Sequence, residues 1–159
     1  MGLTPENLRS QPRIRLAHGT SSVVASAIRL EGLKTQSEGA KAIADGLKTN
    51  PGFVYLKSKL DFHYFDRAIN EMGGEPLLVV VEVPIERLDG DENWFSEAED
   101  FSKYSRSERL IRSLQRGQCK HLGSIPPDQI RHVFLYRQDR NSELRGLDWI
   151  EIPPDLHVF

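Results

Sequence analysis

The feature that most constrains the fold of this chain is the segment 76–84, in which five apolar residues follow one another from Leu77 to Val81. A run of leucine and valine without polar alternation predicts a strand, and it is typical of a strand buried on both faces at the centre of a sheet. Gly73-Gly74 before the run and Pro84 after it mark its ends. We therefore expect the rest of the chain to be built around this strand, which serves as scaffold rather than as a site.

Other segments carry strand and helix signals in a mixed order. A chain of 159 residues is long enough for one domain with a real core, so we expect a flexible arm at 1–12 and a single domain at 13–159. Elements that do not alternate strictly favour an α+β fold with a largely antiparallel sheet. We expect four further strands, which begin at Arg13 or lie at 53–56, 131–137 and 147–152. We also expect four helices: one after residue 22, one at 38–47, one that ends near Asn70, and one at 105–116.

The composition excludes several classes of protein. No apolar run approaches the length of a membrane span, and the first residues lack the basic-then-apolar pattern of a signal peptide. We therefore expect a cytoplasmic protein with no membrane partner. Cys119 is the only cysteine and has no partners at ligand spacing, so the sequence predicts neither a disulfide nor a metal site.

The charges are distributed unevenly although the net charge is only −2. Residues 86–100 carry seven acidic side chains against Arg87, whereas residues 103–120 carry six basic side chains against Glu108. On the expected helix the basic residues form an arginine stripe of Arg106, Arg109, Arg112 and Arg116. The stripe has two interpretations, a face that pairs with the acidic segment or a surface that follows the phosphates of a nucleic acid.

We expect the opening segment, from Arg13 to Ser21, to begin as a short strand and then to turn into a helix. His18, Gly19 and Thr20 then lie at a strand-to-helix corner, where Ser21 or Ser22 caps the helix and Gly32 ends it. Such a corner presents an imidazole and backbone groups to a polar ligand. The alternative is a capped turn with an incidental histidine.

Three segments together resemble the diphtheria-toxin-like ADP-ribosyltransferase superfamily, which includes poly(ADP-ribose) polymerases, nucleic-acid-modifying bacterial relatives and RNA 2′-phosphotransferases. His18-Gly19-Thr20-Ser21 with the later Ile28 and Gly32-Leu33 resembles its first motif. Tyr55, in an aromatic and β-branched strand, resembles the second, and the segment 118–130 with its Ile-Pro-Pro turn resembles the third. The resemblance implies split antiparallel β-sheets with flanking helices, and NAD as co-substrate.

The resemblance also assigns roles to the residues of the first motif. His18 would hydrogen-bond a ribose hydroxyl of NAD, Gly19 would meet the nicotinamide amide through its backbone, and Thr20 would support His18.

In the second motif Tyr55 would stack on the nicotinamide ring, because an aromatic face orients a flat, electron-poor ring. Tyr64 or Phe65, on the following helix, would supply the other face of the stack. The alternative for Tyr55 is a strand aromatic in the core, which is the commoner fate of such residues.

The third motif departs from the family at Gln118, where most relatives carry a glutamate that bonds the ribose and offsets its positive charge. A glutamine keeps the hydrogen bond but not the charge, and losing one such group costs on the order of 3 kcal/mol in a transition state. Three alternatives stay open. Another acid, such as Glu108, Glu97 or Glu99, supplies the charge; the enzyme resembles an RNA 2′-phosphotransferase; or the domain is a catalytically inactive module that binds NAD or ADP-ribose.

The sequence therefore leads to one functional hypothesis. We expect an NAD-dependent mono-ADP-ribosyltransferase with His18, Tyr55 and Gln118 as catalytic residues. The acceptor would be a macromolecule, with nucleic acid (RNA or DNA) favoured over protein because of the arginine stripe. By family analogy such an enzyme would serve as a toxin or effector, with a regulatory protein partner.

Overall fold

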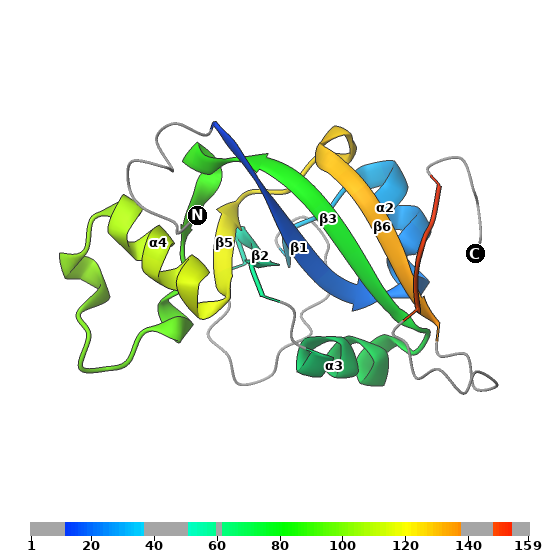
Figure 1. Ribbon diagram of the computed structural model, residues 1–159, viewed down its shortest axis with the longest axis horizontal. Helices are drawn as coiled ribbons and strands as arrows, with labels where there is room; N and C mark the ends of the chain where they lie inside the picture. The colour runs from blue at the N-terminus through cyan, green and yellow to red at the C-terminus, as the bar shows by residue number, and fades with distance from the viewer. Residues whose placement is uncertain (1–11, 37–50, 60–61, 138–147, 154–159) are drawn as a thin grey trace.

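The computed structural model describes residues 12–36, 51–59, 62–137 and 148–153. Within these ranges seven strands form one antiparallel sheet in the order β4-β5-β2-β1-β3-β6-β7, flanked by three α-helices (Figure 1). The α+β class with an antiparallel sheet is therefore confirmed. The expected arm and the helix expected at 38–47 lie outside the described residues, apart from Pro12.

The elements follow the sequence signals closely. Helix α3 packs on β1 and β3, and α4 packs on β4 and β5 at one end of the molecule (Figure 1). The strands are β1 (Arg13–Ser21), β2 (Phe53–Lys57), β3 (Pro76–Pro84), β4 (Leu88–Gly90), β5 (Gln118–Leu122), β6 (Ile130–Arg137) and β7 (Asp148–Glu151), and the helices are α2 (Ala25–Glu31), α3 (Phe62–Met72) and α4 (Arg106–Arg116).

The apolar strand β3 lies between β1 and β6, as its sequence predicted for a central strand. Only one of its faces is fully buried, which corrects the expectation that both would be. On the other face Leu78 is also buried, at 8% exposed, but Glu82 lies between Arg15 and Arg131 and pairs with both, so that part of the face carries ion pairs in place of apolar packing. The buried face is formed by Leu77, Val79, Val81 and Val83, each 0% exposed.

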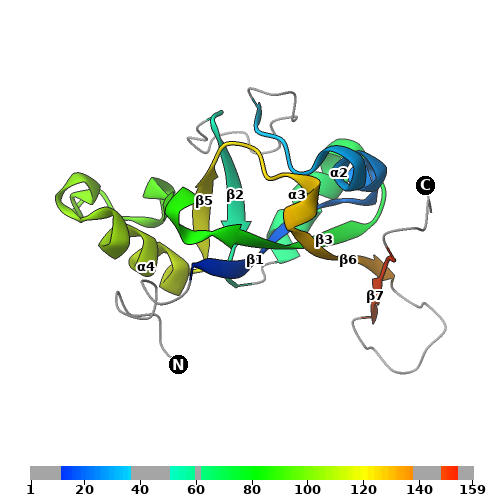
Figure 2. The same cartoon turned by 90° about the horizontal axis from the view of Figure 1, so that it is seen from above.

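The sheet narrows to a joint between β1 and β2. These two strands are paired at a single position, Ala17 with Lys57, whereas β1 pairs with β3 from Arg13 to Ser21. The expected split into two sheets is thus replaced by one sheet whose halves, β4-β5-β2 and β1-β3-β6-β7, meet at this joint. Figure 2 shows β2 and β5 running across the direction of β1 and β3.

Strand β1 is longer than its sequence predicted. It stays paired with β3 as far as Ser21 opposite Pro76, so His18, Gly19 and Thr20 lie inside the strand and not at a corner. The capping role of Ser21 is confirmed, because its hydroxyl oxygen accepts from the N–H of Val23 in the short turn that leads into α2.

Candidate active site at the joint of the sheet

The three residues predicted to be catalytic lie on three adjacent strands. His18 is on β1, Tyr55 on β2 and Gln118 on β5, and these strands are neighbours in the sheet. Lys57 is opposite Ala17 on one side and opposite Gln118 on the other. Residues that are about 100 positions apart in sequence (18 and 118) are therefore held by neighbouring backbones at the joint.

His18 bridges the joint through its side chain. Its Nδ1–H donates to the backbone carbonyl of Tyr55 at 2.9 Å, and the ring is half-buried. Burial lowers the pKa of His18 below its usual value, the bond to Tyr55 opposes this, and the nearby charge of Lys57 lowers it further. The imidazole is therefore neutral at pH 7, and with the proton on Nδ1 its Nε2 carries the lone pair.

The two residues after His18 continue β1 into the buried part of the sheet. Gly19 is opposite Leu78 on β3, and Thr20, 3% exposed, is opposite Leu77. Their predicted roles toward NAD and His18 stay predictions.

Tyr55 is half-buried in β2 and lies opposite Lys120 of β5. It is thus not enclosed in the core, as the alternative interpretation of its sequence required. The helix aromatic Phe65 is in the core instead: it is 2% exposed and packs on Trp149 with ring centroids 5.6 Å apart, so it does not provide the other face of a stack. The side chain of Tyr64 lies outside the described residues.

Gln118 begins β5 and is 9% exposed. Its Nε2–H donates to Oδ2 of Asp91 at 2.5 Å, and its backbone carbonyl accepts from the hydroxyl of Ser113 on α4. The glutamine that replaces the expected glutamate is therefore in direct contact with a carboxylate.

Asp91 is an acid that the sequence did not single out, and it is 0% exposed. Its Oδ1 accepts from the backbone N–H and the Nδ2–H of Asn93, at 3.1 and 3.0 Å. Burial raises the pKa of Asp91, while the hydrogen bonds from Asn93 and Gln118 oppose that change. Nothing in the sequence separates Asp91 from its acidic neighbours, because its contact with Gln118 spans 27 residues.

The three acids proposed from sequence as substitutes for the missing charge are located elsewhere. Glu108 forms a capping box with Ser105 at the start of α4. Glu99 forms two hydrogen bonds with Arg116, which hold the pKa of Glu99 at about 2. Glu97 is exposed on the segment before α4.

Comparisons with known proteins give little beyond this geometry. No family model and no curated protein matches the chain. A solved structure named EcPltA is similar with a TM-score of 0.49 and 12% identity, over 87% of this chain and 82% of that one. In the described ranges no helix has the length and apolar character needed to cross a membrane, and no three histidine, cysteine, aspartate or glutamate side chains gather as a metal site would require.

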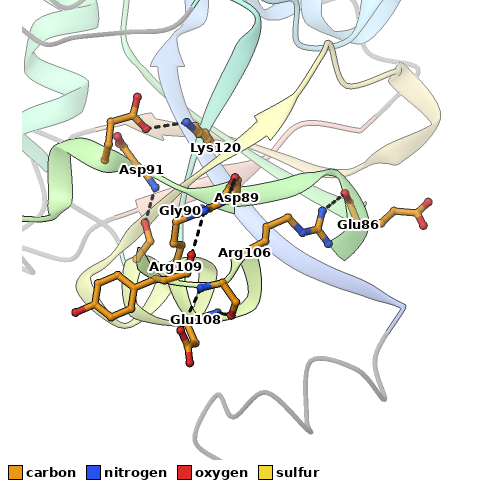
Figure 3. Close-up of polar contacts among 12 residues, drawn as sticks. Glu86, Asp89, Gly90, Asp91, Arg106, Glu108, Arg109 and Lys120 are labelled. Carbon is orange, nitrogen blue, oxygen red and sulfur yellow. Dashed lines mark hydrogen bonds and ion pairs between the residues drawn. The ribbon is translucent and has the colours of Figure 1, made fainter. Parts of the chain in front are cut away.

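The arginine stripe of α4 faces the acidic segment. Arg109 forms two hydrogen bonds with the carboxylate of Asp89, at 3.0 and 2.9 Å, and Arg116 does the same with Glu99 at 2.9 and 2.6 Å. Figure 3 shows the Arg109–Asp89 pair beside Gly90.

The other two arginines of the stripe are also engaged. Arg106 donates to the backbone carbonyl of Glu86 (Figure 3), and the guanidinium of Arg112 lies 4.5 Å from the ring centroid of Tyr104. Two of the four arginines are thus paired with carboxylates of the preceding acidic segment, as the first interpretation of the stripe expects, and binding of nucleic acid by the stripe stays a prediction.

Proposed function

We propose that this chain is an NAD-dependent ADP-ribosyltransferase that acts on a macromolecular acceptor. One observation carries the proposal: His18, Tyr55 and Gln118, chosen from three separate sequence motifs, lie on adjacent strands at one joint of the sheet. A chance match to three motifs gives no reason for the matched residues to meet.

The chemistry of the reaction fits this set of groups. When nicotinamide leaves NAD, positive charge develops on the ribose, as in glycoside hydrolysis. A site for this step must hold the ribose and the leaving ring and must stabilise the charge. His18 accepts a hydrogen bond from a ribose hydroxyl at Nε2, and the ring of Tyr55 stacks on nicotinamide.

The neutral state of His18 supports the same assignment. An imidazolium beside the developing sugar cation would oppose the reaction, and the lowered pKa of His18 avoids this at pH 7. Lys57 provides a fixed positive charge near His18, and an ammonium group is a common ligand of phosphate such as that of the NAD diphosphate.

The test uses the purified chain with two labelled forms of NAD, one labelled in nicotinamide and one in the adenylate phosphate. Each is incubated with total RNA, DNA or protein. We expect nicotinamide release and transfer of phosphate label to one of the three fractions. Both signals should be lost in His18→Ala and Tyr55→Ala and kept in His132→Ala, which removes a histidine of β6 that is paired with Glu151 of β7.

The outcomes separate the alternatives. Label in one fraction identifies the acceptor class, which the engaged arginine stripe leaves to experiment. NAD binding without release favours the inactive binding module. A protein that neither releases nicotinamide nor binds NAD would contradict the proposal.

A further inference from the structure

We infer that Asp91 is a positioning residue for Gln118: it orients the side-chain amide and supplies the negative charge that a glutamine lacks. The inference rests on the proposed function for its catalytic part. Gln118 on β5 and Asp91 just after β4 would together perform the role that one glutamate performs in most members of the resembled superfamily.

The orientation follows from the hydrogen bonds of Asp91. Every hydrogen bond described for its carboxylate comes from an N–H group: two from Asn93 on Oδ1 and one from Gln118 on Oδ2. An ionised carboxylate only accepts, so it selects the nitrogen end of the Gln118 amide. The carbonyl oxygen Oε1 is then the end presented away from Asp91, and within the described residues it accepts no hydrogen bond. It is therefore placed to accept one from a sugar hydroxyl.

The charge follows from the burial of the pair. Asp91 is 0% and Gln118 9% exposed, so water screens the carboxylate only weakly. A hydrogen bond to an ionised acceptor is short and polarises its donor, and here the 2.5 Å contact increases the negative character of Oε1 at the far end of the amide. The negative charge of the Asp91 carboxylate thus acts on a developing sugar cation through the side-chain amide of Gln118.

The structure holds this pair rigidly. The backbone N–H of Asp91 donates to the hydroxyl of Ser113 at 2.9 Å, and that hydroxyl donates to the backbone carbonyl of Gln118. Gly90 allows α4 to approach, because a Cβ there would lie 2.6 Å from the carbonyl oxygen of Arg109. Helix α4 therefore fixes the distance between Asp91 and Gln118.

The charged, titratable and polar groups around Asp91 come from the chain next to it, from β5, from β2 and from α4. Glu92, next in the chain, raises the pKa of Asp91 and is itself paired with Lys120 of β5 at 2.7 Å. Cys119 of β5 has a raised pKa because of burial and the charge of Asp91, so it stays a neutral thiol. Lys57 of β2 is opposite Gln118, and α4 contributes the neutral Ser113.

This arrangement makes an unusual prediction for Gln118→Glu. In the wild-type background the new carboxylate would meet Asp91, and two carboxylates at that distance share one proton. We therefore expect Gln118→Glu alone not to raise nicotinamide release. In Asp91→Asn the clash is absent, so the double variant Asp91→Asn/Gln118→Glu should recover the activity that Asp91→Asn loses.

The kinetic test measures nicotinamide release by wild type, Gln118→Glu, Asp91→Asn, the double variant and Asp89→Asn. We expect Asp91→Asn to lower kcat by at least about tenfold with little change in KM, because the charge acts on the transition state. Asp89→Asn is the matched control: it removes a neighbouring carboxylate, paired with Arg109, and should leave kcat unchanged. Equal losses in Asp91→Asn and in the double variant would overturn the inference.

A second measurement does not require turnover. In ¹⁵N-labelled wild-type protein the side-chain NH₂ resonances of Gln118 should titrate with a midpoint above 3.8, the ordinary pKa of aspartate, because burial raises the pKa of Asp91. The titration should vanish in Asp91→Asn and persist in Asp89→Asn. A Gln118 amide that does not sense pH in the folded wild-type protein contradicts the inference, whereas titration without NAD cleavage contradicts only the proposed function.

Discussion

The imidazole of His18 donates to the backbone carbonyl of Tyr55 at 2.9 Å, so a side chain of β1 ties the backbone of β2 at the place where the two strands pair at Ala17 and Lys57. A residue expected to bind a ligand is thus also a structural link between the halves of the sheet.

We expect His18→Ala to lower the free energy of unfolding by about 1–2 kcal/mol, because the half-buried carbonyl of Tyr55 loses a donor. Urea denaturation measures the change. His132→Ala removes a more exposed histidine and should change the free energy of unfolding by less than about 0.5 kcal/mol. Equal urea midpoints for wild type and His18→Ala would show that the bond does not hold the joint.

Stability should fall as the pH drops below about 6.5. Burial lowers the pKa of both His18 and His121 from 6.5, so their neutral forms favour the folded state. This contribution is complete above the unfolded-state pKa of 6.5 and is lost as the pH falls through the lower folded-state values. Urea midpoints between pH 8 and pH 5 measure the slope.

His121 offers a separate test of that slope. It is 3% exposed, its Nδ1–H donates to the carbonyl of Gly123, and its Nε2 has no partner among the described residues. His121→Leu should therefore flatten the decline in stability between pH 6.5 and pH 5. An unchanged slope would mean that His121 does not contribute to it.

Substitution at Gly90 should disturb the site from a distance. The Cβ of Gly90→Ala would lie 2.6 Å from the carbonyl oxygen of Arg109, so we expect a loss of about 1–3 kcal/mol and a lower Tm. The shift of α4 should also move the side-chain amide resonances of Gln118. Gly73→Ala, where no atom lies within 4 Å of the new Cβ and only φ +74 opposes the change, should leave those resonances in place.

The arginine stripe should contribute little to nucleic-acid binding. Arg109 and Arg116 already form paired hydrogen bonds with Asp89 and Glu99, so we expect Arg109→Gln/Arg116→Gln to leave RNA affinity and its salt dependence unchanged. Filter binding at several salt concentrations measures both. Loss of about two units from the salt slope would instead show two phosphate contacts.

Local signals were enough to predict most of the elements. The apolar run gave β3 with its bounds at Pro76 and Pro84, and Ser105, Glu108 and Gly117 mark the ends of α4. Strand β4 was missed because Leu88–Gly90 lies in an acidic segment and is a strand only through its pairing with β5. The length of β1 was missed for a similar reason, since β3 holds it extended beyond His18.

In the candidate site, too, local signals predicted some residues and long-range contacts determine the others. The motifs pointed to His18, Tyr55 and Gln118, and the structure brings their strands together. Asp91 was out of reach because a buried acid and a solvated one look alike in sequence, and only the fold places α4 and β5 around it. The contacts that decide the chemistry of Gln118 are all long-range.

Because β1 and β2 pair at a single position, each of them has an edge within the sheet that is not paired with the other strand. At the rim the end strands β4 and β7 are short, three and four residues, and α4 covers β4, so the rim offers little backbone for another chain to extend. Beyond Ala17 and Lys57, by contrast, β1 and β2 part within the sheet, and their facing backbones are not joined into a ladder. Under the proposed function, the flat amide of nicotinamide would bind to backbone groups at this parting, in the way that a missing strand would.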